Sequence, residues 1–292
     1  MELICHFRKS GLALSVHGAA NGNKTFRRAT DGLMGHMCSH RSRSPSLPRI
    51  PTVAFISHTG YAARMTFSAA DFLDLSKTEH ASLFQDSAPV WEALKLIRNY
   101  LERFLQPAMK GTTIGTPFIS DRVAIGPGTW VQNGATIIGP AWIGNNCEIR
   151  SGCYIRENVI VGNGVVLGNS CEFKNCIILD EVQIPHFSYV GDSILGYKAH
   201  LAAGVILSNV RLDREEVSVR YGQSKIPTGL RKFGAIVGDK AEIGCNAVIS
   251  PGSIIGRRSL IYPLTHFAGV LAAETILQNH QNLRTIPREL HS

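Results

Sequence analysis

Charged residues are scarce in this chain of 292 residues: Asp, Glu, Lys and Arg together make up 18%, whereas apolar residues make up 44%. That balance is typical of a globular protein and argues against a disordered chain. A long apolar run is also missing, since no stretch approaches the roughly 20 apolar residues that a transmembrane helix needs. The sequence therefore excludes a membrane-spanning helix, and we expect no membrane partner.

Positive charge is in short supply outside the first 64 residues. The whole chain has a net charge of +8, and residues 1–64 alone hold nine Lys or Arg against two acidic residues. The remainder is close to neutral, so it lacks a basic footprint for nucleic acid and we expect no such partner. Residues 1–64 have no helical or strand periodicity. We interpret them as a disordered tail or as sequence upstream of a true start at Met65.

Closely paired cysteines are lacking too. None of the seven cysteines forms a Cys-x-x-Cys pair, which argues against a zinc knuckle, and no metal is predicted. Free cysteines without a secretory signal indicate a reducing compartment, so the sequence predicts a cytoplasmic protein.

Residues 65–118 are predicted to form a helical segment. Ser87, with Pro89 in the following turn, is typical of a helix start, and Pro107 would end the helix. Apolar residues between them recur every three or four positions and form one stripe: Val90, Leu94, Ile97, Leu101 and Phe104. This stripe needs a partner surface, either the flank of the following domain or a neighbouring subunit.

A six-residue repeat dominates residues 119–270. Every sixth residue is large and apolar in the first part of this range: Ile125, Val131, Ile137, Ile143, Ile149, Ile155, Val161, Leu167, Phe173 and Leu179. Three hexapeptides make one triangular coil, and such coils stack at about 4.8 Å. The repeat therefore predicts an all-β fold, a left-handed parallel β-helix that points these side chains inward. Residues 271–292 are expected to be a C-terminal tail.

Two other residue types fit the same repeat. A glycine often follows the inward aliphatic residue, and we expect it to relieve strain where the chain turns. Cys147, Cys153 and Cys171 fall on the smaller inward positions, which indicates packed thiols rather than metal ligands or nucleophiles.

Two interruptions of the repeat are candidates for function, because a solenoid gains stability from regularity. In residues 184–192 the six-residue step shortens to five around Gly191. Residues 211–232 form a charged loop that we expect to be ejected between coils.

Arg156 and Lys174 are eighteen residues apart, which is one full coil. They should stack on one face about 5 Å apart, where two cations repel by roughly 3 kcal/mol at an effective dielectric near 20. An anion between them would remove that cost, and a phosphate with its several acceptor oxygens fits best. The alternative is a pair of solvated surface cations.

His186 follows a proline in the first interruption. A neutral imidazole can accept a proton from an attacking amine near pH 7, which makes His186 a candidate general base. The alternative is a structural histidine that bonds the backbone of a tight turn.

The stretches Ile184–Asp192 and Leu201–Asn209 resemble the acetyltransferase domain of the bifunctional UDP-N-acetylglucosamine pyrophosphorylase/glucosamine-1-phosphate N-acetyltransferases. Residues 208–217 and 229–238 are similar to the archaeal sugar-1-phosphate nucleotidylyltransferase/amino-sugar acetyltransferases. The resemblance covers about residues 120–267 and implies N-acetylation of an amino-sugar 1-phosphate by direct attack of its amine on acetyl-CoA. It also implies a homotrimer with the site between subunits.

The same resemblance implies a role for particular residues. His186 would be the general base, Arg156 and Lys174 would hold the sugar phosphate, and Tyr189 and Asn209 would bind the substrate. On the coenzyme side, the backbone N–H of Ala203 would lie near the thioester carbonyl, and Cys245 stands in place of a serine.

Departures from the family pattern leave alternatives open. His200 replaces a sugar-contacting asparagine, so the sugar is not specified. Residues 1–118 show no counterpart of the nucleotidylyltransferase domain, and we expect no pyrophosphorylase activity. The remaining alternatives are a related acyltransferase acting on another amine and a non-catalytic protein that binds a nucleotide sugar.

Overall fold

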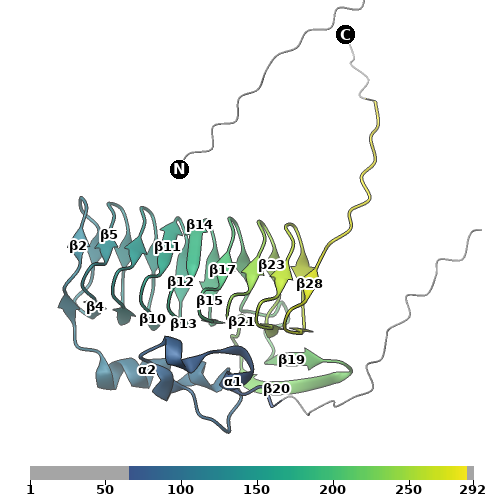
Figure 1. The fold of residues 1–292 in the computed structure, drawn as a ribbon, viewed down its shortest axis with the longest axis horizontal. Helices are drawn as coiled ribbons and strands as arrows, with labels where there is room; N and C mark the ends of the chain where they lie inside the picture. Colours follow the sequence, from purple (N-terminus) through teal and green to yellow (C-terminus); the bar gives the residue numbers. More distant parts are fainter. Residues whose placement is uncertain (1–65, 288–292) are drawn as a thin grey trace, which may run out of the picture. The chain divides into compact units, whose positions relative to one another are not determined.

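The computed structural model describes residues 66–287, and most of them form a parallel β-solenoid (Figure 1). Three sheets run along the solenoid, two of nine strands and one of eight, and every pairing within them is parallel. The predicted parallel β-helix is therefore confirmed. The first paired strands already lie at residues 108–113 and the last at 276–277, so the coils extend beyond the predicted range at both ends.

The strands of the three sheets follow one another in rotation along the chain. Sheet A consists of β1 (Ala108–Met109), β4 (Val123–Ile125), β7 (Ala141–Ile143), β10 (Val159–Val161), β13 (Cys176–Ile178), β16 (Ile194–Leu195), β21 (Ala235–Val237), β24 (Ser253–Ile255) and β27 (Val270–Leu271). Sheet B consists of β2 (Thr112–Thr113), β5 (Trp130–Val131), β8 (Glu148–Ile149), β11 (Val166–Asn169), β14 (Gln183–His186), β17 (His200–Leu201), β22 (Glu242–Ile243), β25 (Leu260–Ile261) and β28 (Ile276–Leu277). Sheet C consists of β3 (Phe118–Ile119), β6 (Thr136–Ile137), β9 (Tyr154–Ile155), β12 (Glu172–Lys174), β15 (Tyr189–Gly191), β18 (Ile206–Leu207), β23 (Val248–Ile249) and β26 (His266–Phe267).

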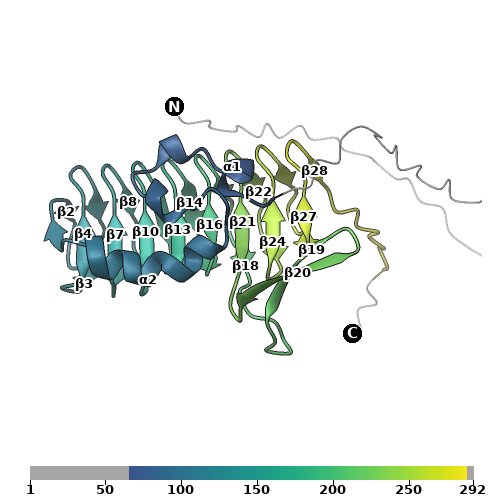
Figure 2. The same cartoon turned by 90° about the horizontal axis from the view of Figure 1, so that it is seen from below.

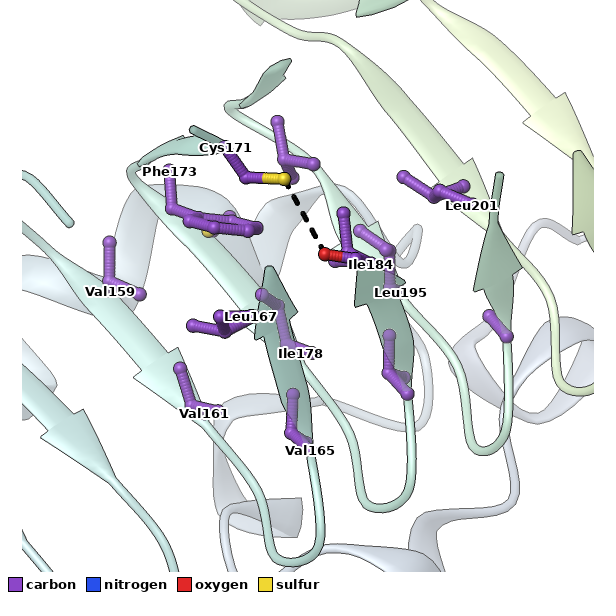
Figure 3. Packing of buried hydrophobic residues seen from close by; sticks show 14 of the residues in the cluster. Val159, Val161, Val165, Leu167, Cys171, Phe173, Ile178, Ile184, Leu195 and Leu201 are labelled. Carbon is purple, nitrogen blue, oxygen red and sulfur yellow. Dashed lines mark hydrogen bonds between the residues drawn. The ribbon is translucent and has the colours of Figure 1, made fainter. Parts of the chain in front are cut away.

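The solenoid core contains the repeated aliphatic residues, stacked in layers (Figure 3). Nine of the ten predicted inward positions, Ile125 to Phe173, belong to this core, and so do Cys147, Cys153 and Cys171. The prediction for Leu179 is wrong. The step after Phe173 has only five residues, so Ile178 pairs with Val161 and faces inward, while Leu179 packs outside the solenoid.

At the corners of the coils, the residues that turn the chain are not the residues that pack against the next coil. Gly126, Gly144 and Gly162 follow inward residues, but none has a positive φ. A methyl group on Gly144 would instead lie 2.5 Å from the Gly162 carbonyl oxygen in the next coil. The left-handed residues come two positions later, at Gly128, Asn146 and Gly164. These glycines are therefore needed for contact between coils, and the expectation that they relieve strain at the turn is wrong.

The N-terminal segment covers the outer face of sheet A (Figure 2). It contains the helices α1 (Ala69–Phe72) and α2 (Glu92–Phe104) and the short 3-10 helices Leu75–Lys77 and Ala81–Leu83. Val90, Leu94, Ile97 and Leu101 are buried against Ile160, Ile177 and Ile194, but Phe104 is 45% exposed and lies off the stripe. Helix α2 also starts later than Ser87, because residues 89–91 form a turn before it.

The loop predicted between coils is a hairpin of β19 (Val217–Tyr221) and β20 (Ser224–Leu230). Val217 and Val219 pack in the same outer core as α2. Sheet A is thus covered by α2 and the hairpin, while most outer-face residues of sheets B and C are partly or fully exposed in the single chain. Within residues 66–287 no helix has the length and apolarity to cross a bilayer.

Candidate functional site

Arg156 and Lys174 lie on adjacent coils of sheet C, as the eighteen-residue spacing predicts. Ile155 pairs with Phe173, which puts the two cations at equivalent positions, and the Arg156 N–H donates to the Phe173 carbonyl at 2.9 Å. The two residues therefore share one face of the solenoid.

Carboxylates of the protein already neutralise both cations. Arg156 contacts Glu172 at 3.0 Å and Glu157 at 3.6 Å, and Lys174 contacts Asp192 at 3.4 Å. The hydrogen bond to Glu172 raises the pKa of the Arg156 guanidinium, so it stays protonated. The repulsion that we expected a phosphate to relieve is thus offset within the chain. That electrostatic argument is wrong, although the positions of both cations agree with it.

Asp192 organises this end of sheet C. Its buried carboxylate accepts hydrogen bonds from Asn175 Nδ2 at 2.9 Å and from Asn209 Nδ2 at 2.5 Å, besides its contact with Lys174. Asn175 and Asp192 occupy successive corners with positive φ, where Asn and Asp are tolerated better than most residues. The network fixes the amide of Asn209, one of the predicted substrate-binding residues.

Tyr189 and Asn209 converge above Gly191. A methyl group on Gly191 would lie 2.5 Å from the Tyr189 hydroxyl oxygen and 2.6 Å from Asn209 Nδ2. Burial raises the pKa of Tyr189, and the nearby Asp192 and Glu172 carboxylates raise it further, so the hydroxyl remains a donor at neutral pH. The predicted substrate-binding residues Lys174, Tyr189 and Asn209 therefore form one polar cluster, held together by Asp192.

His186 ends strand β14, at the corner where sheet B meets sheet C. Its side chain is exposed, and its carbonyl accepts from the Gly204 N–H at 3.1 Å. Strand β14 can run close to its neighbour β11 here because β11 has a glycine, Gly168, opposite Pro185. A methyl group on Gly168 would lie 1.7 Å from the Pro185 carbonyl oxygen.

His186, Ala203 and Cys245 form a row along this corner on three consecutive coils. The carbonyl of each accepts from the next coil: Gly204 N–H donates to His186, Asn246 N–H to Ala203 and Leu264 N–H to Cys245. Since coils stack at about 4.8 Å, His186 and Cys245 lie on the order of 10 Å apart. The predicted base and the predicted coenzyme contacts are thus in line, and Cys245 is exposed.

His200 does not join the cluster on sheet C. It pairs with Gln183 and Glu242 on sheet B and lines a cavity of about 220 Å³ with Tyr262 and Pro263. Within one chain it is separated from Tyr189 by the corner that holds His186.

Sequence reasoning missed Asp192, Asn175 and Gly168 as parts of the site. A signal was present in the sequence, since Asn158, Asn175 and Asp192 recur every seventeen residues. In the structure all three have positive φ. In residues 66–287 no group of three or more His, Cys, Asp or Glu side chains is arranged to hold a metal ion.

The chain is similar to several known proteins over part of its length. The model of the GMPPB C-terminal domain family matches residues 137–224. A bifunctional sugar-1-phosphate nucleotidylyltransferase/acetyltransferase of Sulfurisphaera tokodaii is 40% identical over 92 residues, which are 32% of this chain and 23% of that protein. The chain thus spans less than a quarter of the length of that relative. A solved perosamine N-acetyltransferase of Caulobacter crescentus, bound to CoA and GDP-perosamine, is 19% identical, with a TM-score of 0.26 over 63% of this chain and 59% of that one.

A longer match is to the uncharacterized acetyltransferase YaiX of Escherichia coli O6:K15:H31. The two are 35% identical over 193 residues, which are 65% of this chain and 83% of YaiX. A match of this identity that spans most of the relative establishes common membership. This chain therefore belongs to the hexapeptide-repeat acetyltransferase family that includes YaiX.

Proposed function

We propose that this acetyltransferase moves an acetyl group from acetyl-CoA to the amine of an amino-sugar 1-phosphate. The observation that carries the proposal is the row of His186, Ala203 and Cys245 along one corner, next to the Lys174, Tyr189 and Asn209 cluster. Direct transfer between two bound substrates requires a general base next to the coenzyme, with polar side chains beside them that hold the acceptor. The row and the cluster have this arrangement.

His186 acts as the general base in this proposal. The amine nitrogen bonds to the thioester carbonyl carbon, the imidazole takes a proton from that nitrogen, and the carbon–sulfur bond breaks to release the thiolate. The exposure of His186 lets an amine reach it. Within residues 66–287 the Ala203 N–H donates to no other protein group, which leaves it available to the developing oxyanion.

On the acceptor side, Arg156 and Lys174 hold the sugar phosphate, and Tyr189 and Asn209 orient the sugar and its amine. An incoming phosphate would compete with Glu172 for Arg156 and with Asp192 for Lys174. The phosphate contact therefore replaces existing ion pairs, so its net contribution to affinity is smaller than that of two unpaired cations.

We further propose a homotrimer. His200 on sheet B and Tyr189 on sheet C flank the His186 corner from two sides, and the outer faces of both sheets are free to pack against other copies of the chain. Sheet B of one copy against sheet C of the next would bring these side chains together in a closed cyclic assembly. Light scattering coupled to size exclusion measures the mass, and a monomer at assay concentrations contradicts this arrangement.

Thiol release from acetyl-CoA tests the function. We expect release with glucosamine 1-phosphate and none with glucose 1-phosphate, which matches it in charge but lacks the amine. Equal release with both sugars would show hydrolysis rather than N-acetylation. Absence of release across a panel of amino-sugar phosphates would rule out the proposed acceptor class.

A further inference from the structure

A large cavity lies beside the site between the β19–β20 hairpin and the outer face of sheet C, and we call it the hairpin cavity. Its volume is about 540 Å³, and its lining comes from the segment after β18, from β19 and from the coils around Ser250 and His266. A single phosphate is much smaller than such a space, which falls within the range of pockets that bind drug-sized ligands. None of the residues assigned above to the base, the substrate or the coenzyme lines it.

The walls of the cavity are fixed before any ligand arrives. Val217 and Val219 of β19 are fully buried against the solenoid, and the hairpin lies against β24 and β27 (Figure 2). Gly252 and Gly269 permit this close approach. A methyl group on Gly252 would lie 2.8 Å from Val217 Cγ1, and one on Gly269 would lie 3.4 Å from the Arg220 carbonyl oxygen.

Arg220 contributes a positive charge to the hairpin cavity. It lines the cavity, and no carboxylate within residues 66–287 forms an ion pair with it, whereas the neighbouring Arg211 is held by Asp213.

The distribution of charge favours the hairpin cavity as an anion site. Residues 211–232 contain six cationic and three acidic side chains, a net charge of +3. The cluster on sheet C pairs Arg156 and Lys174 with three carboxylates, those of Glu157, Glu172 and Asp192. The insertion that carries the hairpin is therefore net positive, and of its charged residues Arg211, Asp213 and Arg220 line the cavity, a net charge of +1.

Ser250 and His266 supply neutral donors on the opposite wall. Ser250 Oγ and His266 Nε2 are 2.7 Å apart. If the hydroxyl donates to Nε2, the Nδ1–H of His266 remains free, and if Nε2–H donates, the hydroxyl hydrogen remains free. In either tautomer the pair keeps one donor for a ligand oxygen.

We propose that the hairpin cavity binds the phosphate-bearing part of a substrate that is larger than a sugar 1-phosphate. Arg220 contacts the phosphate oxygens from the hairpin, Ser250 and His266 contact them from the coils, and Val210, Val248 and the fully exposed Leu212 contact the attached group. The proposed phosphate site does not depend on which residues are catalytic. Only the choice of candidate ligands rests on the proposed function. Either a nucleotide-linked acceptor or the coenzyme supplies this chemistry.

Calorimetric titration of the full chain distinguishes the sources. Coenzyme A, uridine diphosphate glucosamine and glucosamine 1-phosphate are titrated in turn into the wild type, Arg220→Gln and the matched control Lys225→Gln. Lys225 has the same charge in the same hairpin but does not line the cavity. We expect Arg220→Gln to weaken the ligand that reaches the cavity about tenfold, as for other hydrogen bonds to a charged group, and Lys225→Gln to change it less than twofold.

A loss confined to coenzyme A assigns the cavity to the coenzyme, and a loss confined to the nucleotide sugar assigns it to the acceptor. Ser250→Ala provides a second variant inside the cavity and should weaken the same ligand about fivefold. Equal effects of Arg220→Gln and Lys225→Gln on all three ligands, or no binding of any of them to the wild type, would overturn the proposal. Calorimetry measures binding and not turnover, so the result tests the cavity even if the protein does not transfer acetyl groups to an amino-sugar phosphate.

Discussion

Acidification should weaken the contact between the N-terminal segment and the solenoid through one buried histidine. His80 is 1% exposed, and its ring packs edge-on against Trp142 of sheet A at 4.9 Å between centroids. Nδ1 lies 3.0 Å from the Tyr100 hydroxyl, while Nε2 is buried without a hydrogen-bond partner. Glu79 is 3.9 Å from Nε2 but half exposed, so water screens it. Burial of the ring therefore outweighs these two polar neighbours and disfavours its protonated form.

Burial lowers the pKa of His80 from 6.5 to about 4. Well above pH 6.5 the ring is neutral whether the chain is folded or unfolded, so its protonation has no effect on stability. Between pH 6.5 and 4 the unfolded chain binds a proton that the folded chain does not, and stability falls as the pH falls. At pH 4.5 the loss from this residue is on the order of 2 kcal/mol.

The assay compares urea unfolding of the wild type and His80→Phe at pH 7 and at pH 4.5. Phenylalanine keeps an aromatic ring against Trp142 but cannot be protonated, and its loss of the Tyr100 hydrogen bond is independent of pH. We expect the wild type to lose roughly 2 kcal/mol more than the variant between the two pH values. His280→Phe, at an exposed position, should behave like the wild type. A parallel loss in wild type and His80→Phe would refute the reasoning.

Two further predictions concern the corner that holds the candidate site. Gly168→Ala would place a methyl group 1.7 Å from the Pro185 carbonyl oxygen, so we expect a loss of about 1–3 kcal/mol in unfolding free energy and a lower kcat through displacement of His186. Wild-type stability and turnover in this variant would contradict the proposed role of the glycine. Cys245 is the exposed thiol among the cysteines of residues 66–287, and we expect saturating acetyl-CoA to slow its alkylation. An unchanged alkylation rate would remove Cys245 from the coenzyme contacts.

The solenoid was predictable because its period is short and repeats many times. Each inward apolar residue from Ile125 to Phe173 is set by the same six-residue step, so a local pattern defines a long-range stack. The step that follows is five residues long, and nothing in the apolar pattern decides between Ile178 and Leu179, which are both buried. The choice is made by the tight corner at Asn175, whose positive φ becomes evident only in the folded chain.

The candidate site was predictable in its positions but not in its electrostatics. The eighteen-residue spacing of Arg156 and Lys174 specifies that they stack, because coil length sets register. It does not reveal that Glu172 and Asp192 pair with them, since those partners depend on side-chain directions at the edge of sheet C. The hairpin cavity could not be foreseen for a similar reason, because a charged insertion does not specify which face of the solenoid it will cover.

Chemical rescue of His186→Ala tests the account's central claim most directly. Thiol release from acetyl-CoA with glucosamine 1-phosphate is measured for the wild type, His186→Ala and the exposed-site control His280→Ala. If His186 accepts the proton of the attacking amine, His186→Ala is about 10²- to 10⁴-fold slower, added imidazole restores part of the rate, and His280→Ala matches the wild type. A His186→Ala variant that turns over at the wild-type rate would contradict the account.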